Sequence, residues 1–137
     1  MTTRRGVLTA GAALLPMSAA AATAVAPARI FEWTFLKSIG EDPTSLAKFI
    51  RANWFAMDAK SVQRGLMTGY ALHVAADPGD WNVVVIVGYP DRRGYAGIAP
   101  VFEEIRRAHV TVDGPLSKHG RIVASRKLLP DGEEALT

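Results

Sequence analysis

The chain has 137 residues, with 16 lysines and arginines against 13 aspartates and glutamates, and it contains no cysteine. This length predicts a single domain, and the lack of cysteine excludes disulfides, thiol chemistry, iron–sulfur clusters and zinc bound through cysteine. The short basic pairs, Arg92-Arg93 and Arg106-Arg107, are interleaved with acidic residues. We interpret them as solvated faces and expect no nucleic-acid partner.

The first 28 residues have the composition of a signal peptide. Arg4 and Arg5 precede an uncharged, alanine-rich run that ends in Ala26-Pro27-Ala28, a small-x-small cleavage pattern. The run is long enough to span a bilayer, but it is only weakly hydrophobic and Pro16 interrupts it. We therefore expect cleavage after Ala28 rather than a retained anchor.

The segment "TTRRGVL" resembles a twin-arginine translocation signal, which implies export of a folded protein, and a general secretory signal is the alternative. Either route predicts a periplasmic or secreted protein with no stable membrane anchor after cleavage. Removing residues 1–28 leaves 14 basic against 13 acidic residues, so the mature chain is nearly neutral. We expect the folded domain to occupy residues 29–130 and residues 131–137 to form a flexible tail.

The mature chain begins with a predicted strand and a predicted helix. The alternation in "RIFEWTFLKS" (29–38) predicts a half-buried strand, with aromatic side chains on one face and Glu32 and Thr34 on the other. A proline at the first helical position, preceded by Asp42 as a favoured N-cap, then predicts a helix over residues 43–60.

The middle of the chain predicts a hairpin. Alternating apolar residues predict a strand over 63–76, and the valine-rich segment 81–89 predicts a third, central strand. The sequence "DPGD" (77–80) between them places proline and glycine at the centre of a tight turn. A connection this short makes the two strands antiparallel.

A second helix and a last strand complete the predicted order. Helical spacing of apolar residues covers 95–109, but Pro100 fits only in a first turn, which predicts that the regular helix begins near Ala99. Residues 121–129 alternate as a strand. The order β-α-β-β-α-β is the ferredoxin-like arrangement, an α+β fold in which a four-stranded antiparallel sheet carries both helices on one face. The valine-rich strands leave apolar residues on the other face, which a second subunit could cover.

Two segments carry a resemblance to a known superfamily. The segments "FIRANWFAMD...QRGL..GYALH" and "DWNVVVIVGYPD..GYAGIAPVFEEIRRAH", together with the element order and the size, resemble the dimeric α+β barrel superfamily. It includes the antibiotic-biosynthesis and haem-degrading monooxygenases, the EthD-like proteins and the stress-responsive barrel proteins. The resemblance covers nearly all of the mature chain and implies a homodimeric α+β barrel, but fold alone does not determine function.

A helical wheel places one polar side chain on the apolar stripe of each predicted helix. Asn53 falls within the stripe of the first helix, and His109 falls at the centre of the stripe of the second. A buried amide or imidazole without a partner costs about 1–3 kcal/mol. These two residues, with Trp54 and Asp58 beside them, predict a ligand-binding cleft between helices and sheet. Each residue also has a structural interpretation. Asn53 can bond a strand-edge carbonyl, and His109 can interact with the helix dipole. Trp54 can pack in the core, and Asp58 can be solvated.

The resemblance also implies roles for particular residues. In the haem-degrading relatives a histidine near the end of the second helix binds the haem iron, and His109 matches it in pattern. Those enzymes also use an asparagine on the first strand and a tryptophan on the second helix. Here the strand offers Glu32 and Trp33, and the helix offers no tryptophan. We expect no cofactor, and the three separated histidines do not have metal-ligand spacing.

The sequence therefore predicts an exported homodimer that binds a small, largely apolar molecule in the helix–sheet cleft. The first alternative is a cofactor-independent, monooxygenase-like enzyme in which His109 is the catalytic base or ligand and Asn53 orients the substrate. The second alternative is a non-catalytic, partner-binding dimer. It relies on Phe55, which the helical wheel places on the outer face of the first helix as an exposed aromatic contact.

Overall fold

The computed structural model describes residues 27–77 and 79–130. The predicted signal peptide and the C-terminal tail lie outside the described residues, except for positions 27 and 28. The sheet is built from β2 (Ile30–Ser38), β3 (Gly69–Val74), β4 (Val83–Tyr89) and β5 (Gly120–Leu128). Three α-helices, α2 (Thr44–Ala52), α3 (Trp54–Gln63) and α4 (Tyr95–Ala108), and a short 3₁₀ turn at Leu116–Lys118 complete the fold.

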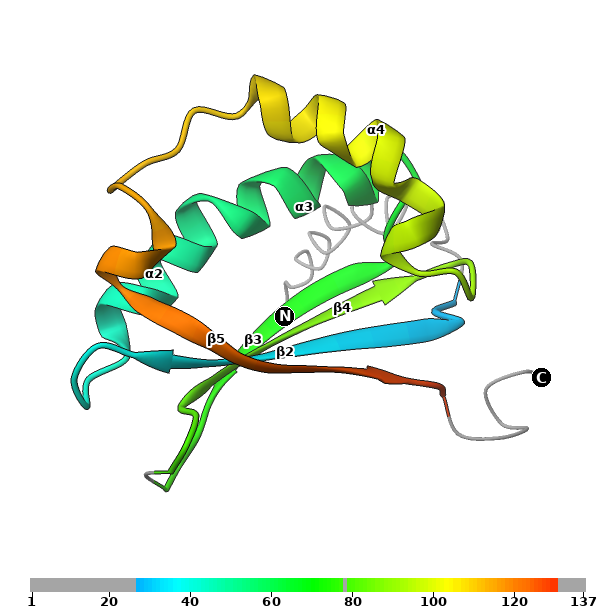
Figure 1. Ribbon diagram of the computed structural model, residues 1–137. Coiled ribbons are helices and arrows are strands. Elements are labelled where there is room, and N and C mark those ends of the chain that lie inside the picture. The colour runs from blue at the N-terminus through cyan, green and yellow to red at the C-terminus, as the bar shows by residue number, and fades with distance from the viewer. Residues whose placement is uncertain (1–26, 78, 131–137) are drawn as a thin grey trace, which may run out of the picture.

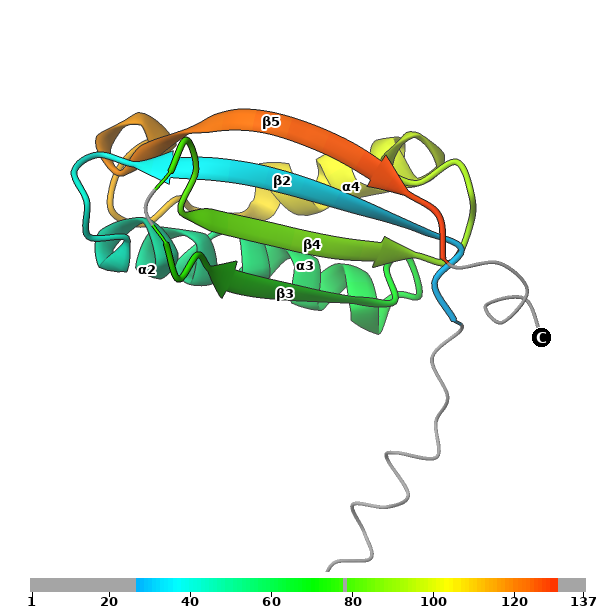
Figure 2. The same cartoon turned by 90° about the horizontal axis from the view of Figure 1, so that it is seen from below.

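The four strands form one antiparallel sheet in the order β3-β4-β2-β5. Figures 1 and 2 show all helices on one face of this sheet, with α4 behind β5 and β2 and with α2 and α3 behind β4 and β3. No described helix or loop covers the other face (Figure 2). The predicted ferredoxin-like α+β fold is confirmed.

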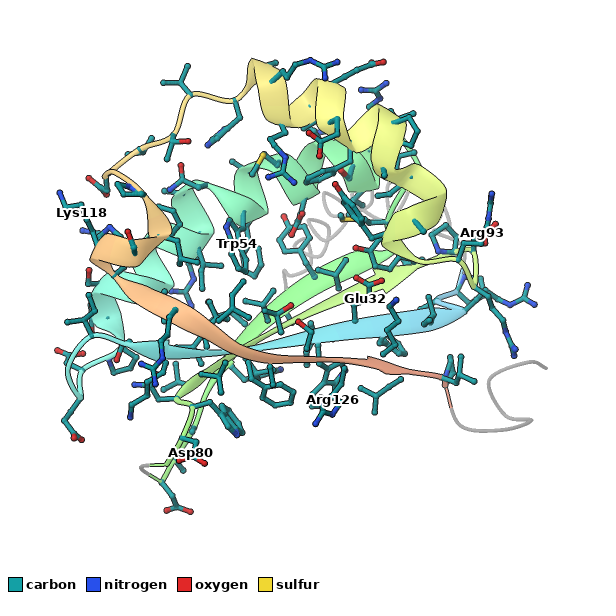
Figure 3. All side chains as sticks on the ribbon, viewed as in Figure 1. Glu32, Trp54, Asp80, Arg93, Lys118 and Arg126 are labelled. Carbon is teal, nitrogen blue, oxygen red and sulfur yellow. The ribbon has the colours of Figure 1, made fainter. Side chains whose placement is uncertain are left out.

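The alternation along β2 decides what each face of the sheet carries. Glu32 pairs with Val87, and Thr34 pairs with Val85, on the face beneath the helices. The aromatic residues of β2 point away from the helices, where Trp33 pairs with Ile86 and with Arg126 of β5. Figure 3 shows Arg126 on this open side and Glu32 on the helix side. The core under the helices divides into two apolar clusters, one beneath α2 and one between α3 and α4.

The first predicted helix is not one straight element. It is divided into α2 and α3 by Asn53, whose φ of −117° and ψ of −66° depart from helical values. The backbone hydrogen bonds continue across the division, since Asn53 N–H donates to Phe49 O and Asn53 O accepts from Met57 N–H. Asn53 is therefore a kink between two helical segments, and the second segment continues to Gln63, which shortens the following strand to Gly69–Val74.

The prediction for Phe55 is wrong. The ring is half-buried against the core cluster beneath α2, and its centroid lies 4.5 Å from that of Tyr70 on β3. The helical wheel assumed one straight axis through residues 43–60, whereas the kink redirects α3 and brings Phe55 onto β3. Phe55 therefore contributes to packing within the domain, and it does not offer an exposed aromatic contact.

The start of the second helix also differs from the prediction. α4 begins at Tyr95 and contains Pro100 in its second turn, although proline there removes a helical hydrogen bond. The carbonyl that loses its partner belongs to Ala96, and both Ala96 and Pro100 are exposed. Water can therefore solvate that carbonyl, which lowers the cost of the proline.

Candidate functional site

A cavity of about 300 Å³ lies between the sheet and the helices α3 and α4. We call it the helix–sheet cavity. Figure 3 shows Trp54 and Glu32 reaching into the space between helix and sheet from opposite sides. Most of the other lining residues are apolar. The cavity is lined by Glu32, Thr34, Trp54, Met57, Asp58, Met67, Val85, Val87, Tyr89, Tyr95, Phe102 and Arg106.

The spacing of residues in each element explains which side chains line the cavity. Glu32 and Thr34 are two residues apart on β2 and share the helix-facing side. Trp54, Met57 and Asp58 have the i, i+3, i+4 spacing that places side chains on one face of α3. The kink at Asn53 sets the direction of that face, because α3 begins at the next residue.

Asp58 is the least compensated polar group in the cavity. Its residue is only 5% exposed, and in the described ranges its carboxyl makes no hydrogen bond or ion pair. Burial raises the pKa of Asp58 to about 7, because desolvation disfavours the charged form. The alternative interpretation of the sequence, in which Asp58 is a solvated residue, is therefore wrong. A carboxyl titrating near neutrality can accept a proton or hold a negative charge.

Glu32 is fixed at the start of α4. One of its carboxylate oxygens accepts the backbone N–H of Tyr95 at 3.2 Å. Gly94 precedes this contact with a φ of +60°, and a Cβ there would clash with the same carboxylate. A negative charge at a helix N-terminus is favourable because unpaired N–H groups and the helix dipole converge there. The turn before α4 therefore orients Glu32.

The phenol of Tyr89 lies among these acids. Burial, the negative charges of Glu32 and Asp58, and the neighbouring Tyr95 all raise the pKa of Tyr89 above its ordinary value. The phenol therefore stays protonated and is a hydrogen-bond donor beside two carboxyl groups. This places two acids and a phenol together at the polar end of an otherwise apolar cavity.

Arg106 lies at the exposed rim of the cavity, and its charge is already engaged. Its Nε donates to Glu103 at 3.2 Å, its guanidinium lies 5.6 Å from the ring centroid of Phe102, and one terminal nitrogen lies 3.5 Å from the hydroxyl of Tyr95. Tyr95 donates its own hydroxyl to Glu103 at 3.0 Å. Arg106 therefore balances Glu103 on the surface of α4.

The structure brings Asn53 and His109 together but does not place either in the cavity lining. Asn53 Oδ1 accepts from His109 Nε2 at 2.9 Å and from the backbone N–H of Val112 at 2.7 Å. Asn53 Nδ2 donates to the carbonyls of Phe49 and Val112, both at 3.0 Å. Asn53 thus has a partner for each amide atom, and it ties the kink to the loop after α4. Trp54 and Asp58, in contrast, line the cavity, and their role in ligand binding stays a prediction.

The Nε2 atom of His109 is not free to bind a haem iron. In the amide orientation that satisfies both Asn53 donors, Oδ1 is an acceptor, so His109 Nε2 carries the hydrogen. A nitrogen that donates a hydrogen bond cannot coordinate iron at the same time. His109 is also absent from the cavity lining. Its catalytic role stays a prediction.

Two further polar clusters join elements that are far apart in the chain. Ser45 Oγ lies 2.6 Å from His119 Nδ1, and His119 Nε2 lies 2.8 Å from the carbonyl of Asp113. Both side chains of the first pair are exposed to water, and they join the start of α2 to the loop before β5. Asn82 is buried. Its Oδ1 accepts the backbone N–H of Ser38 and its Nδ2 donates to Ser38 Oγ, which fixes the start of β4 beside the end of β2.

Sequence reasoning missed Glu32, Tyr89 and Tyr95 as cavity residues. The signal available for Glu32 was its position in an alternating strand, where an acidic residue shares a face with Thr34 and apolar positions. The two tyrosines gave no signal, because an aromatic residue at a strand end or helix start is consistent with ordinary packing. Within residues 27–77 and 79–130, no three histidine, aspartate or glutamate side chains are grouped to bind a metal ion.

Comparison with protein-family models, curated proteins and solved structures found no significant match. Among the described residues, no helix has the length and apolar character needed to cross a membrane.

We predict that Asn53→Ala lowers the free energy of unfolding by about 2–4 kcal/mol, because it removes four side-chain hydrogen bonds, two of them to the backbone of Val112. His109→Ala removes only one of the four hydrogen bonds of Asn53 and should cost about 1 kcal/mol. Urea denaturation of both variants measures the difference. Equal losses would contradict the central position of Asn53.

We predict that Asp58 makes the protein less stable as pH rises from 4 to 7. Because the folded pKa is raised, its stabilising contribution is complete below the unfolded pKa and is lost as pH rises through about 7. The difference from an ordinary value of about 3.9 corresponds to about 4 kcal/mol.

Urea denaturation between pH 4 and pH 8 tests this prediction, with wild type compared to Asp58→Asn. The asparagine variant should gain stability relative to wild type as pH rises. Asp80→Asn, which changes an exposed carboxyl, is the matched control and should follow wild type. A wild-type profile parallel to that of Asp58→Asn would contradict the prediction.

Proposed function

We propose that this chain is a binding protein for a small, largely apolar molecule, which it holds in the helix–sheet cavity. The observation that carries the proposal is Asp58, a buried carboxyl without a protein partner that lines a cavity of about 300 Å³. Small-molecule sites typically combine an apolar lining with a few polar groups that orient the ligand. The cavity has this composition, with Glu32, Asp58 and Tyr89 at its polar end.

We also propose that the protein is a homodimer of the dimeric α+β barrel type. In support, the open sheet face carries a continuous set of apolar side chains that one chain leaves partly exposed, and water contact of this surface is unfavourable. Trp33, Phe35 and Trp81 form an aromatic row within it, with ring centroids 6.1 and 5.0 Å apart. Other partly exposed apolar residues of this face are Phe31, Ala71, Ile86, Ala124 and Leu128.

Export to the periplasm or outside the cell belongs to the same proposal. Its support is the arginine pair, the alanine-rich run and the cleavage pattern of residues 1–28. A domain of this size without disulfides has a modest core, and burying the open sheet face against a second copy would add to it.

An acid–base enzyme is the second candidate function. The observation that favours it is the pKa of Asp58 at about 7, since a general base is most effective when its pKa is close to the working pH. In this version Asp58 transfers the proton, and Tyr89 donates a hydrogen bond to the substrate. The monooxygenase-like alternative instead uses His109, whose Nε2 is hydrogen-bonded to Asn53, so Nδ1 is the ring nitrogen that would act as the base.

We predict that filling the cavity abolishes ligand retention. Val87→Phe adds a ring at a half-buried position of the lining, and Val110→Phe places the same ring on an exposed loop as a matched control. Native mass spectrometry of protein purified from its own host reports any retained molecule in each variant. We expect retention in wild type and Val110→Phe and its loss in Val87→Phe. A ligand that Val87→Phe still holds would contradict the proposed site.

We predict that Ile86→Lys converts the dimer to a monomer, because it buries a charge at the centre of the open sheet face. Val110→Lys, at a position 81% exposed on a loop, is the control that should stay dimeric. Sedimentation velocity measures the masses. A wild-type protein that sediments as a monomer at micromolar concentration would overturn the dimer proposal and leave the cavity proposal intact.

A further inference from the structure

We propose that the molecule held in the helix–sheet cavity carries a protonated amine, which sits between the carboxyl groups of Glu32 and Asp58 and the aromatic rings around them. This inference rests on the proposed binding function and specifies the class of ligand. The rest of the molecule is an aliphatic or aromatic body of modest size.

The polar end of the cavity has negative charge that the chain does not balance. In the described residues neither Glu32 nor Asp58 forms an ion pair, since the two ion pairs join Arg93 to Asp91 and Arg106 to Glu103. Arg106 is the one cationic residue in the lining, and its ion pair with Glu103 is on the exposed surface of α4. Asp58 is buried and Glu32 is half-buried, and a positive partner offsets the hydration that such carboxylates lose. The complementary ligand group is therefore a cation.

Aromatic side chains surround the same space. Trp54 enters from α3, Tyr89 from β4, and Tyr95 and Phe102 from α4. The last two rings meet edge to face, with centroids 5.6 Å apart and an interplanar angle of 73°. The faces of aromatic rings attract cations, and cages of several rings with a carboxylate are a recurring way to bind ammonium groups. The ring set therefore favours an ammonium group over a neutral donor.

The remaining lining limits the rest of the ligand. Met57, Met67, Val85 and Val87 form an apolar wall whose side chains have no hydrogen-bond donor and, as acceptors, only the weakly accepting methionine sulfurs. Methionine side chains adapt to irregular shapes, which suits a short alkyl chain or a single ring. A ligand with several hydroxyl or carboxylate groups would lose hydration there without regaining hydrogen bonds.

The ligand class sets a direction for the pH dependence of binding. Asp58 is faced by Glu32 from β2, by Tyr89 from β4, and by Tyr95 and Arg106 from α4. Only the ionised carboxyl attracts an ammonium group, and the pKa of Asp58 in the free protein is about 7. Alkyl ammonium groups keep their proton to about pH 10. Amine affinity should therefore increase as pH rises from 6 to 8, whereas a neutral ligand should show little change.

The test compares three probes of the same size: 2-phenylethylamine, 2-phenylethanol and phenylacetate. Each is titrated into the mature protein at pH 6 and pH 8 by isothermal calorimetry. We expect the amine to bind at least about tenfold more tightly than the alcohol at pH 8, the scale of one charge-assisted hydrogen bond. We expect this ratio to shrink at pH 6 and phenylacetate to bind least.

Two variants localise the effect. Asp58→Asn keeps the shape of the side chain and should lower amine affinity about tenfold at pH 8 while leaving alcohol affinity unchanged, so the alcohol also reports that the cavity is folded. Asp80→Asn removes an exposed carboxyl in the hairpin on the other side of the sheet (Figure 3) and should leave both affinities unchanged.

The outcomes separate this inference from the proposed function. Equal binding of amine and alcohol, or preference for phenylacetate, overturns the amine inference and leaves the apolar binding function standing. Failure of all three probes to bind overturns both. Tighter amine binding that Asp58→Asn does not weaken overturns the role of the carboxyl pair.

Discussion

The four hydrogen bonds of the Asn53 side chain hold the arrangement on which the rest of the site depends. They join the last turn of α2 to the loop after α4, through the carbonyl of Phe49, both backbone groups of Val112 and the ring of His109. The same residue is the kink at which α3 takes a new direction. Because α3 starts at the next residue, the kink sets the direction in which Trp54 and Asp58 point, and both line the cavity. An amide is suited to this position, since it offers two donors and an acceptor in one buried side chain.

The second constraint is the alternation of side chains along β2. A strand alternates its side chains between two faces, and β2 uses the two faces for different purposes. Its acidic and hydroxyl residues line the cavity, and its aromatic residues form the open face. A shift of one residue in the pairing with β4 would exchange these sets and place Glu32 on the outside. The cavity and the open face are therefore linked through one register, which Asn82 helps to fix at the end of the strand.

The sequence predicted the order of elements and the sheet because those depend on local alternation and turn residues. It also predicted that Asn53 and His109 face inward and that Trp54 and Asp58 lie near one another. It could not predict that Asn53 and His109 satisfy each other, because that contact joins residues 56 positions apart in the chain. Phe55 was misplaced for a related reason. A helical wheel assumes a straight axis, and the kink comes from hydrogen bonds to a distant loop.

Asp58 and Asn53 show why a buried polar residue is not by itself a sign of function. Both lie on the inner side of the helices, and both are less than a tenth exposed. Asn53 stabilises the fold because every polar atom of its side chain has a partner. Asp58 destabilises the fold at neutral pH, since its charged form has lost water and gained no partner. A chain that only needed packing there would be more stable with an apolar residue, and residues that reduce stability in this way are concentrated at binding and catalytic sites. The two residues differ in whether their polar atoms have partners, which is why Asp58, and not Asn53, supports the proposed site.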